Sequence, residues 1–267
     1  EMSKVLSVTQ AFMMIAPMLA PVLGALILKV ADWKMTFIAL ALLTGISLVG
    51  AFLLQETLPV SERTQSNTIQ SILGLRKIAK KPNFMSLLLV GAFISAPYMA
   101  YLALASYIYI DGFGVSETTF SMYFAINSAA AILGPIMYMR FGAGSVKKVI
   151  NVGIVVAIIS AVLILTVGNI SPIIFLLSYV IYSIVTSYFR PLISDLLLSA
   201  TKTDVGAASS VMNFVFTVLG SVGMIVGSLA WSSYISGLAI TMLIFIAITI
   251  LVWFYILKAK SIKFDWK

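Results

Sequence analysis

The stretch GLAITMLIFIAITILVWFYIL, residues 237–257, contains no charged side chain. A helix needs about 20 consecutive apolar residues to cross the roughly 30 Å hydrocarbon core of a bilayer, and this stretch has that length. The strands of a membrane barrel would instead alternate apolar and polar residues over about ten positions. Since only helices and closed barrels can satisfy their backbone in lipid, the stretch predicts a transmembrane helix.

Seven more stretches of similar length and composition precede it. The expected spans are residues 5–28, 35–54, 84–110, 119–139, 149–167, 172–198, 206–230 and 237–257. The whole chain shares this bias, because 61% of its 267 residues are hydrophobic and only 10% are charged, whereas a soluble domain carries about 25% charged residues. The sequence therefore predicts an all-α polytopic membrane protein with eight transmembrane helices.

The basic residues gather on one side of these spans. Only Lys29 and Lys34 lie on the other side, and Arg190 lies within a span. The basic residues of the first side are Lys4, Arg63, Arg76, Lys77, Lys80, Lys81, Arg140, Lys147, Lys148, Lys202, Lys258, Lys260, Lys263 and Lys267. Because cytoplasmic loops carry the excess of lysine and arginine, we expect both chain ends in the cytoplasm and a multi-pass protein of the bacterial inner membrane.

Several kinds of chemistry are excluded by composition. The chain has no cysteine and no histidine, which removes disulfides, Cys/His metal sites and a histidine base. It carries no phosphate-binding loop, so ATP-driven transport is not expected. The spans hold no acid at mid-depth and no paired acids or Ser-Lys set that an intramembrane hydrolase would need. The sequence therefore predicts a protein that is not an enzyme, with no cofactor, no metal and no nucleic-acid partner.

Small residues in the first span follow a known spacing. Ser7, Ala16, Ala20, Pro21, Gly24 and Ala25 fall at the positions of the pattern G-x8-G-x3-G-P-x2-G-G. Pro21 and Gly24 match it outright, and the other four positions hold serine or alanine in place of glycine. The span resembles the antiporter motif of the major facilitator superfamily, and its small residues allow close packing against a neighbouring helix.

Two further patterns extend this resemblance. Trp33-Lys34 with Phe37, and Glu56-Thr57-Leu58-Pro59, resemble the W-R-x-x-F and E-T-L signatures that flank the sixth helix of drug–proton antiporters. Gly134 through Gly142, followed by Lys147-Lys148, is similar to the superfamily's cytoplasmic motif between helices eight and nine. The chain as a whole resembles helices five to twelve of a twelve-helix facilitator, and is most similar to Bcr/CflA-type drug-resistance transporters.

The resemblance implies a division of the chain. Residues 1–57 would be the last two helices of an N-terminal bundle, and 84–258 a C-terminal six-helix bundle. Residues 58–83 are polar and then basic and amphipathic, as expected of a linker with a helix on the membrane surface. Residues 259–267 would form a basic cytoplasmic tail. The expected partners are the lipid bilayer and the missing N-terminal helices of the same transporter.

The resemblance also implies a function, namely proton-coupled efflux of small amphipathic drugs by alternating access. A proton exchanger needs a buried carboxylate or histidine. Asp195 lies near the inner end of its span, so the titrating group is expected in the missing helices, with Asp195 as a substitute. The alternative is a non-transporting truncated remnant or an assembly partner of a transporter.

Two spans carry polar residues that could line a substrate cavity. Tyr179, Tyr182, Ser183, Thr186 and Arg190 recur every three or four residues, which places them on one helix face. In span 84–110, Tyr98 and Tyr101 follow Pro97, where a proline could bend the helix at a gate. Other interpretations remain open: hydroxyl bonds within or between helices, a static kink, and an Arg190 that extends to the membrane boundary or pairs with Asp195.

Other small or polar residues predict gating or helix packing. Asn127 and Asn213 each have a hydroxyl-bearing residue four positions away on the same face, Tyr123 and Thr217, and we expect interhelical hydrogen bonds there. Gly134 belongs to the cytoplasmic motif. The glycines of span 206–230, namely Gly220, Gly223 and Gly227, form a small-residue seam. The resemblance would pack this seam against a helix of the missing portion, although a permanent static contact is equally compatible.

Overall fold

The computed structural model describes residues 20, 23–24, 26–55, 68–142, 144–201 and 205–259. Over these residues the regular structure is helical, and seven helices are long and apolar enough to cross a membrane. Each of them coincides with one expected span, whereas the expected span 5–28 lies mostly outside the described residues. An all-helical polytopic membrane fold is therefore confirmed, with seven spans in the described part of the chain.

The spans differ in how regular they are. Five spans are single continuous helices: α2 (Lys34–Leu53), α7 (Val146–Val167), α8 (Pro172–Ser199), α9 (Val205–Gly227) and α10 (Tyr234–Lys258). In one of the other two, α4 (Pro82–Ser106) continues as a π-helix, η2 (Tyr107–Gly112). In the other, α5 (Glu117–Ala131) is followed by α6 (Leu133–Phe141). A short helix, α3 (Thr68–Ala79), precedes α4.

Serine side chains begin three of the spans. Ser116, Ser171 and Ser233 accept a hydrogen bond from a backbone N–H in the first turn of α5, α8 and α10 respectively. Such caps stabilise a helix by about 1 kcal/mol because the first N–H groups have no partner inside the helix. The short polar connections between the spans therefore determine where these helices start.

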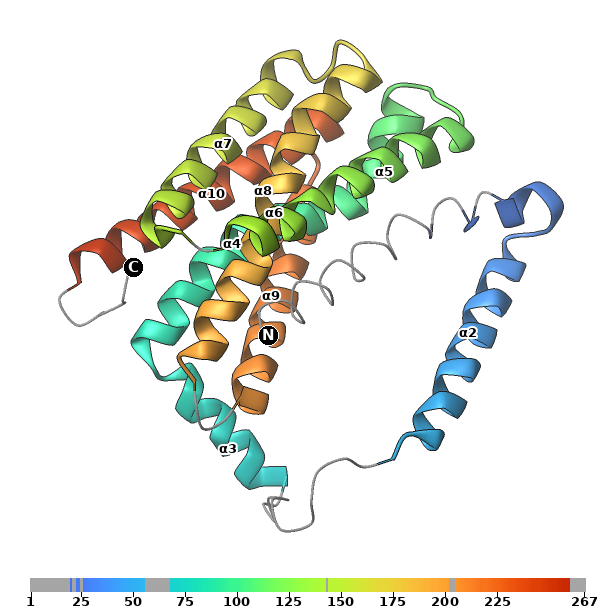
Figure 1. The fold of residues 1–267 in the computed structure, drawn as a ribbon. Helices are drawn as coiled ribbons and strands as arrows, with labels where there is room; N and C mark the ends of the chain where they lie inside the picture. The colour runs from blue at the N-terminus through green and yellow to red at the C-terminus, as the bar shows by residue number, and fades with distance from the viewer. Residues whose placement is uncertain are drawn as a thin grey trace.

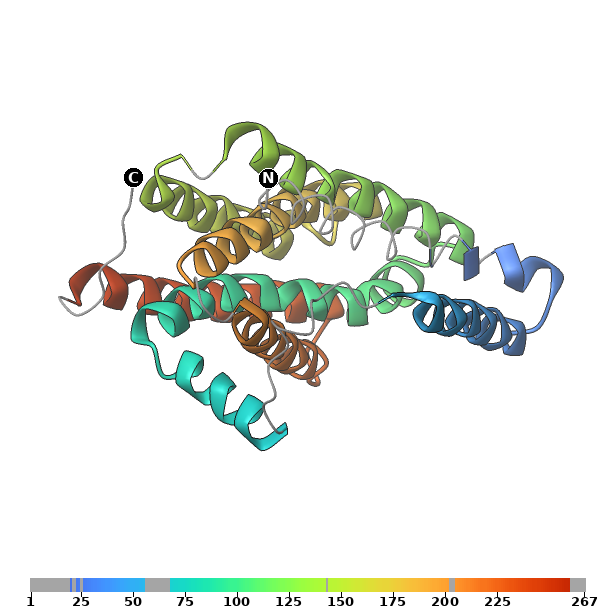
Figure 2. The same cartoon turned by 60° about the horizontal axis from the view of Figure 1, so that its bottom comes forward.

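The helices from α4 to α10 form one bundle with α4 inside it (Figure 1). α4 packs against α8, α9 and α10, while α7 packs against α8 and α10. α5 and α6 cover α8. By contrast, α2 lies apart from these helices in Figure 1 and contributes no buried residue. Figure 2 shows the bundle turned by 60°. The core that positions the candidate site is thus built from the last six spans.

The amphipathic helix expected before the third span is α3, and it contacts the bundle. It packs against α9 and α4 at one end of the bundle (Figure 1). Its apolar residues Leu75 and Ile78 join the core, whereas Arg76 and Lys77 are exposed. The last turns of the helix therefore bury these apolar side chains against protein and present their basic residues outward.

Glycines allow α9 to approach α4 closely. A Cβ at Gly223 would lie 2.5 Å from the carbonyl oxygen of Ala96, and one at Gly227 would lie 2.9 Å from Cβ of Ala100. Gly220 faces Met99 in the same way. The seam therefore does not face a helix outside the present chain, which was one of the two alternatives that the sequence left open. Its partner is α4, because only glycine leaves room for the two backbones to meet.

The glycine seam yields a stability prediction. Gly223→Ala should lower the thermal unfolding temperature of the purified protein, because overpacking a close contact costs about 1–3 kcal/mol. Gly206→Ala is the matched control on the same helix, since a Cβ at Gly206 meets no atom within 4 Å. Equal unfolding temperatures for both variants would mean that the α4–α9 contact is looser than the structure shows.

Candidate functional site

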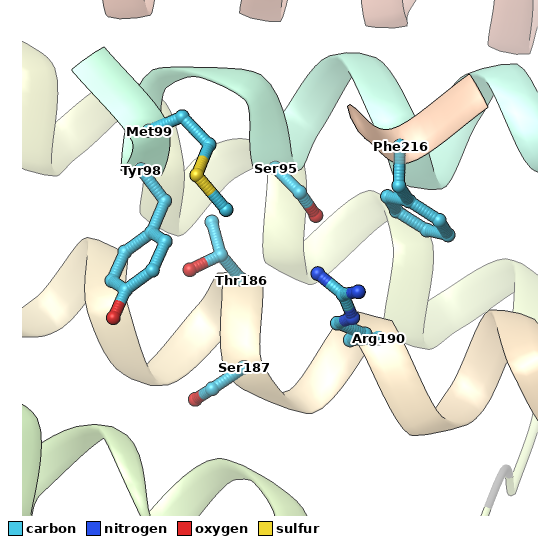
Figure 3. Close-up of a pocket in the computed structure, with 7 residues that line it drawn as sticks. All are labelled: Ser95, Tyr98, Met99, Thr186, Ser187, Arg190 and Phe216. Atoms are coloured by element: carbon cyan, nitrogen blue, oxygen red, sulfur yellow. The ribbon is translucent and has the colours of Figure 1, made fainter. Parts of the chain in front are cut away.

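A small polar pocket lies between α4, α8 and α9 (Figure 3). Its lining residues are Ser95, Tyr98, Met99, Thr186, Ser187, Arg190 and Phe216. Its volume is about 30 Å³, which is room for about one water molecule. Three of the predicted cavity residues, Tyr98, Thr186 and Arg190, are thus brought together from two helices that are distant in sequence.

Arg190 is the charged group of this pocket. It lies nine residues before the end of α8, which is about 14 Å at a rise of 1.5 Å per residue and places it inside the hydrocarbon depth. Its guanidinium carbon lies 4.9 Å from the centre of the Phe216 ring, a distance at which a cation is attracted to the ring face. In Figure 3 the hydroxyl of Ser95 points toward the guanidinium.

Asp195 does not neutralise Arg190. The Asp195 carboxylate accepts a hydrogen bond from the Tyr138 hydroxyl at 2.6 Å and one from Ser199 at 3.3 Å. The two residues are five positions apart on α8 and so point in different directions. Within the described ranges no carboxylate pairs with Arg190, so the pairing considered from the sequence is not found. The pocket keeps a positive charge inside the bundle.

The remaining predicted cavity residues lie in the packed core. The Tyr101 ring stacks on the Tyr179 ring with centroids 3.9 Å apart, and it also stacks with the Phe124 ring at 5.7 Å. Both tyrosine side chains are fully buried, and over the described residues neither hydroxyl has a hydrogen-bond partner. The stripe on α8 is therefore divided, with Tyr179 in the aromatic core and Arg190 in the pocket.

Two hydrogen bonds connect α8 to its neighbours between these regions. The Tyr182 hydroxyl donates to the backbone oxygen of Ile94 at 2.6 Å, shortly before Pro97 interrupts the backbone ladder of α4. The Ser183 hydroxyl donates to Oδ1 of Asn127 on α5 at 2.8 Å. Both contacts cross between helices, so this part of the stripe joins α8 to α4 and α5.

The structure describes Gly134 of the cytoplasmic motif and part of the antiporter motif. Gly134 packs against α8, since a Cβ there would overlap the Ser187 hydroxyl. In the antiporter motif, Ser7, Ala16, Pro21 and Ala25 lie outside the described residues, and Ala20 is exposed. A Cβ at Gly24 would meet no neighbour within 4 Å.

α9 carries an exposed polar stripe. Ser210, Asn213, Thr217 and Ser221 are exposed and recur every three or four residues, which places them on one face. Ser210 and Ser221 donate to carbonyl oxygens of their own helix. Asn213, near the middle of the helix, makes no interhelical hydrogen bond in the described part, contrary to expectation. An amide at this depth is unfavourable against lipid, so this face of α9 suits water or another polar surface.

Sequence reasoning did not select Met99 and Phe216 for the pocket. Both are apolar, and an apolar side chain on a membrane helix can face lipid, the core or a cavity. The available signal was spacing, because Met99 lies one turn after Ser95 on α4. This spacing predicts a pocket residue only when it is known which face of α4 is turned toward α8 and α9.

A bundle of membrane-spanning helices with a cationic polar pocket between them is typical of membrane transport proteins. The sequence model of the Major Facilitator Superfamily matches residues 1–224, and the chain therefore belongs to this superfamily. The superfamily is a class of transporters and not of enzymes, in agreement with the prediction from the sequence.

Three curated relatives are MFS-type or drug-resistance proteins, and the two that are named for drug resistance confirm the resemblance to drug-resistance transporters. The chain is 31% identical to the uncharacterized MFS-type transporter YdgK of Bacillus subtilis over 83% of this chain and 57% of that protein. It is 27% identical to the chloramphenicol resistance protein CraA of Acinetobacter baumannii over 45% of this chain and 29% of that protein. It is 26% identical to the bicyclomycin resistance protein homolog of Haemophilus influenzae over 53% and 36% respectively. The chain thus matches little more than half the length of the first relative.

The contact between Tyr182 and Ile94 can be tested directly. Tyr182→Phe keeps the ring but removes the hydroxyl that bonds α4, so the protein should lose about 0.5–1.5 kcal/mol of stability. Thermal unfolding of the purified variant measures this loss. Tyr255→Phe is the control, because Tyr255 is 61% exposed on α10. Unfolding of Tyr182→Phe at the wild-type temperature would contradict the hydrogen bond.

Proposed function

We propose that the chain is part of a secondary transporter that exports small amphipathic drugs in exchange for protons. The observation that carries this proposal is Arg190, a cation inside the membrane-spanning bundle without a carboxylate partner in the described part. Intramembrane charges are unfavourable and mark transport paths. The relatives named for chloramphenicol and bicyclomycin resistance support drugs as the cargo.

The chemistry of the pocket suits oxygen-bearing amphipathic molecules. The Arg190 guanidinium offers several N–H donors in one plane, and the Phe216 ring holds it in place. Tyr98 and Thr186 add hydroxyls that can donate or accept. Met99 contributes a flexible thioether, which adapts to apolar groups of different shape. One polar anchor with an adaptable apolar wall fits a set of chemically diverse drugs.

The pocket is too small to hold such a drug alone. Sites for drug-sized ligands usually measure about 300–1,000 Å³, against about 30 Å³ here. We propose that the pocket is one corner of a larger site that forms between two bundles during alternating access. The polar stripe of α9 with Asn213 would line the same space. In this arrangement residues 84–258 form the C-terminal bundle.

The N-terminal part would belong to the other bundle. The apolar side chains of α2 are uncovered over the described residues, as expected of a helix whose neighbours are lipid and further spans. We propose that residues 1–57 are the last two helices of an N-terminal bundle, joined by residues 58–83, and that 259–267 form the tail. The proton-exchanging carboxylate would lie in the N-terminal bundle, because Asp195 is engaged by Tyr138.

The same uncovered helix supports the second candidate function, an assembly partner or remnant that cannot transport alone. Transport assays in proteoliposomes distinguish this function from drug export by the chain. Drug-driven proton movement by the isolated chain would contradict the second function. Movement that appears only when the four preceding spans of a homologous transporter are added as a separate fragment would support it.

Arg190 yields the main functional prediction. In the native full-length protein, Arg190→Gln should reduce drug export by about ten- to a hundredfold, because a hydrogen bond to a charged group contributes about 1.5–3 kcal/mol. Arg190→Lys should retain part of the activity. Export is measured as drug-dependent proton movement in proteoliposomes.

Arg76→Gln is the control, since Arg76 is an exposed cation on α3, away from the pocket. It should change export less than about twofold, because its removal leaves every group of the pocket in place. If Arg190→Gln exports at the wild-type rate at equal protein amounts, Arg190 has no role in the path.

The orientation is testable because the chain has no cysteine. We propose that the α6–α7 connection faces the cytoplasm and the α7–α8 connection faces outward. Single cysteines at exposed positions, Ser145→Cys and Asn169→Cys, report these sides. In intact cells a membrane-impermeant maleimide should label only Asn169→Cys, and permeabilisation should add Ser145→Cys. The reverse labelling pattern would invert the topology.

A further inference from the structure

A second hollow lies on the surface of the bundle, between α6, α7 and α8. Its volume is about 490 Å³. Val152 and Val156 of α7 line one wall, Ile181 and Val185 of α8 line the other, and Phe141 of α6 lies at one end. It shares no lining residue with the pocket of Arg190. The hollow is therefore a separate apolar groove.

The packing of α7 on α8 explains the groove. At Gly153 of α7 the ring of Phe189 lies directly on the backbone, so that a Cβ there would overlap the ring. Farther along, the Ser160 hydroxyl donates to the backbone oxygen of Ser178 at 2.6 Å and joins the two helices. These two contacts fix α7 and α8 relative to each other, so the groove between them is part of the packed fold.

One end of the groove is positively charged. Lys148 lines it, is exposed, and lies in the first turn of α7. No carboxylate is among the lining residues. A cation at one end and apolar side chains along the rest match the layout of an anionic phospholipid, whose charged headgroup and apolar chains are arranged in the same order.

The length of the groove also fits one leaflet. Lys148 and Val156 are eight residues apart on α7, which is about 12 Å at 1.5 Å per residue. Half of a roughly 30 Å hydrocarbon core is about 15 Å. Since Lys148 lies at a helix end, where headgroups are found, the groove extends from the headgroup level toward the middle of the bilayer.

We propose that this groove binds an anionic phospholipid, with an acyl chain between α7 and α8 and the headgroup phosphate on Lys148. If lipid were attracted by charge alone, Lys147 and Lys148 would contribute equally to binding, because both are exposed in the same turn. Only Lys148 lines the groove, so a lipid in the groove would depend on Lys148. The inference rests on the groove alone and holds whether or not the proposed transport function is correct.

Native mass spectrometry of the purified protein tests the charged end. Phosphatidylglycerol and phosphatidylcholine with the same acyl chains are titrated in parallel. The wild-type protein should bind one phosphatidylglycerol molecule more tightly than phosphatidylcholine. Lys148→Gln should weaken phosphatidylglycerol binding about three- to tenfold, and Lys147→Gln less than twofold, since about 1 kcal/mol of lipid attraction per basic residue is worth roughly fivefold. Equal effects of both variants, or equal binding of the two lipids, would overturn the proposal.

A second pair of variants tests the apolar end. Val152→Trp should fill the groove and abolish the tight phosphatidylglycerol site, whereas Val155→Trp, at a valine of α7 that does not line the groove, should leave it unchanged. The two valines are comparably exposed, at 53% and 55%, so neither variant disturbs the core. Unfolding temperatures confirm that each variant is folded. Wild-type lipid binding by Val152→Trp, or a hydrophobic drug or a second copy of the chain bound there in place of lipid, would contradict the proposal.

Discussion

The constraint on which this structure depends is that hydrocarbon offers no hydrogen bond to a polar group. Each span is helical because its backbone groups must bond within the helix, and several side-chain hydroxyls in the bundle bond a backbone oxygen of a neighbouring helix. Tyr182 bonds a backbone oxygen of α4, and Ser160 bonds one of α8. Such bonds form only where helices approach closely. Glycines supply that proximity, as at Gly223 against Ala96.

Arg190 is significant because it places a full charge, and not a neutral hydroxyl, in the bundle interior. Tyrosines and serines in the bundle interior are packed or bonded to neighbouring helices, but the guanidinium is held by an aromatic face and has no carboxylate in the described part. A charge inside the bundle without a carboxylate partner is favourable only if water or a ligand reaches it during part of the functional cycle. In the alternating access proposed here, the small volume of its pocket would correspond to a closed arrangement of the bundle.

The bundle presents different surfaces in different directions. The exposed stripe with Asn213 on α9 is polar at mid-depth, whereas the groove between α7 and α8 is apolar with Lys148 at its end. Polar groups at mid-depth suit a water-filled path, and an apolar groove with a cation at the headgroup level suits lipid. The same six spans thus separate a proposed transport path from a proposed lipid site, and neither proposal depends on the other.

The sequence by itself determined the number and limits of the spans that the structure describes, because crossing lipid requires a local run of apolar residues that can be read without neighbours. It also identified the superfamily through motifs along the chain. Only the tertiary structure decided which residues of the α8 stripe share a pocket. Tyr179 and Arg190 lie on the same helix face, yet one stacks on Tyr101 and the other lies over Phe216. The partner of the glycine seam was likewise undetermined, since a seam of small residues predicts a close contact but does not say which helix makes it, and helix order in a membrane is set by packing between residues distant in sequence.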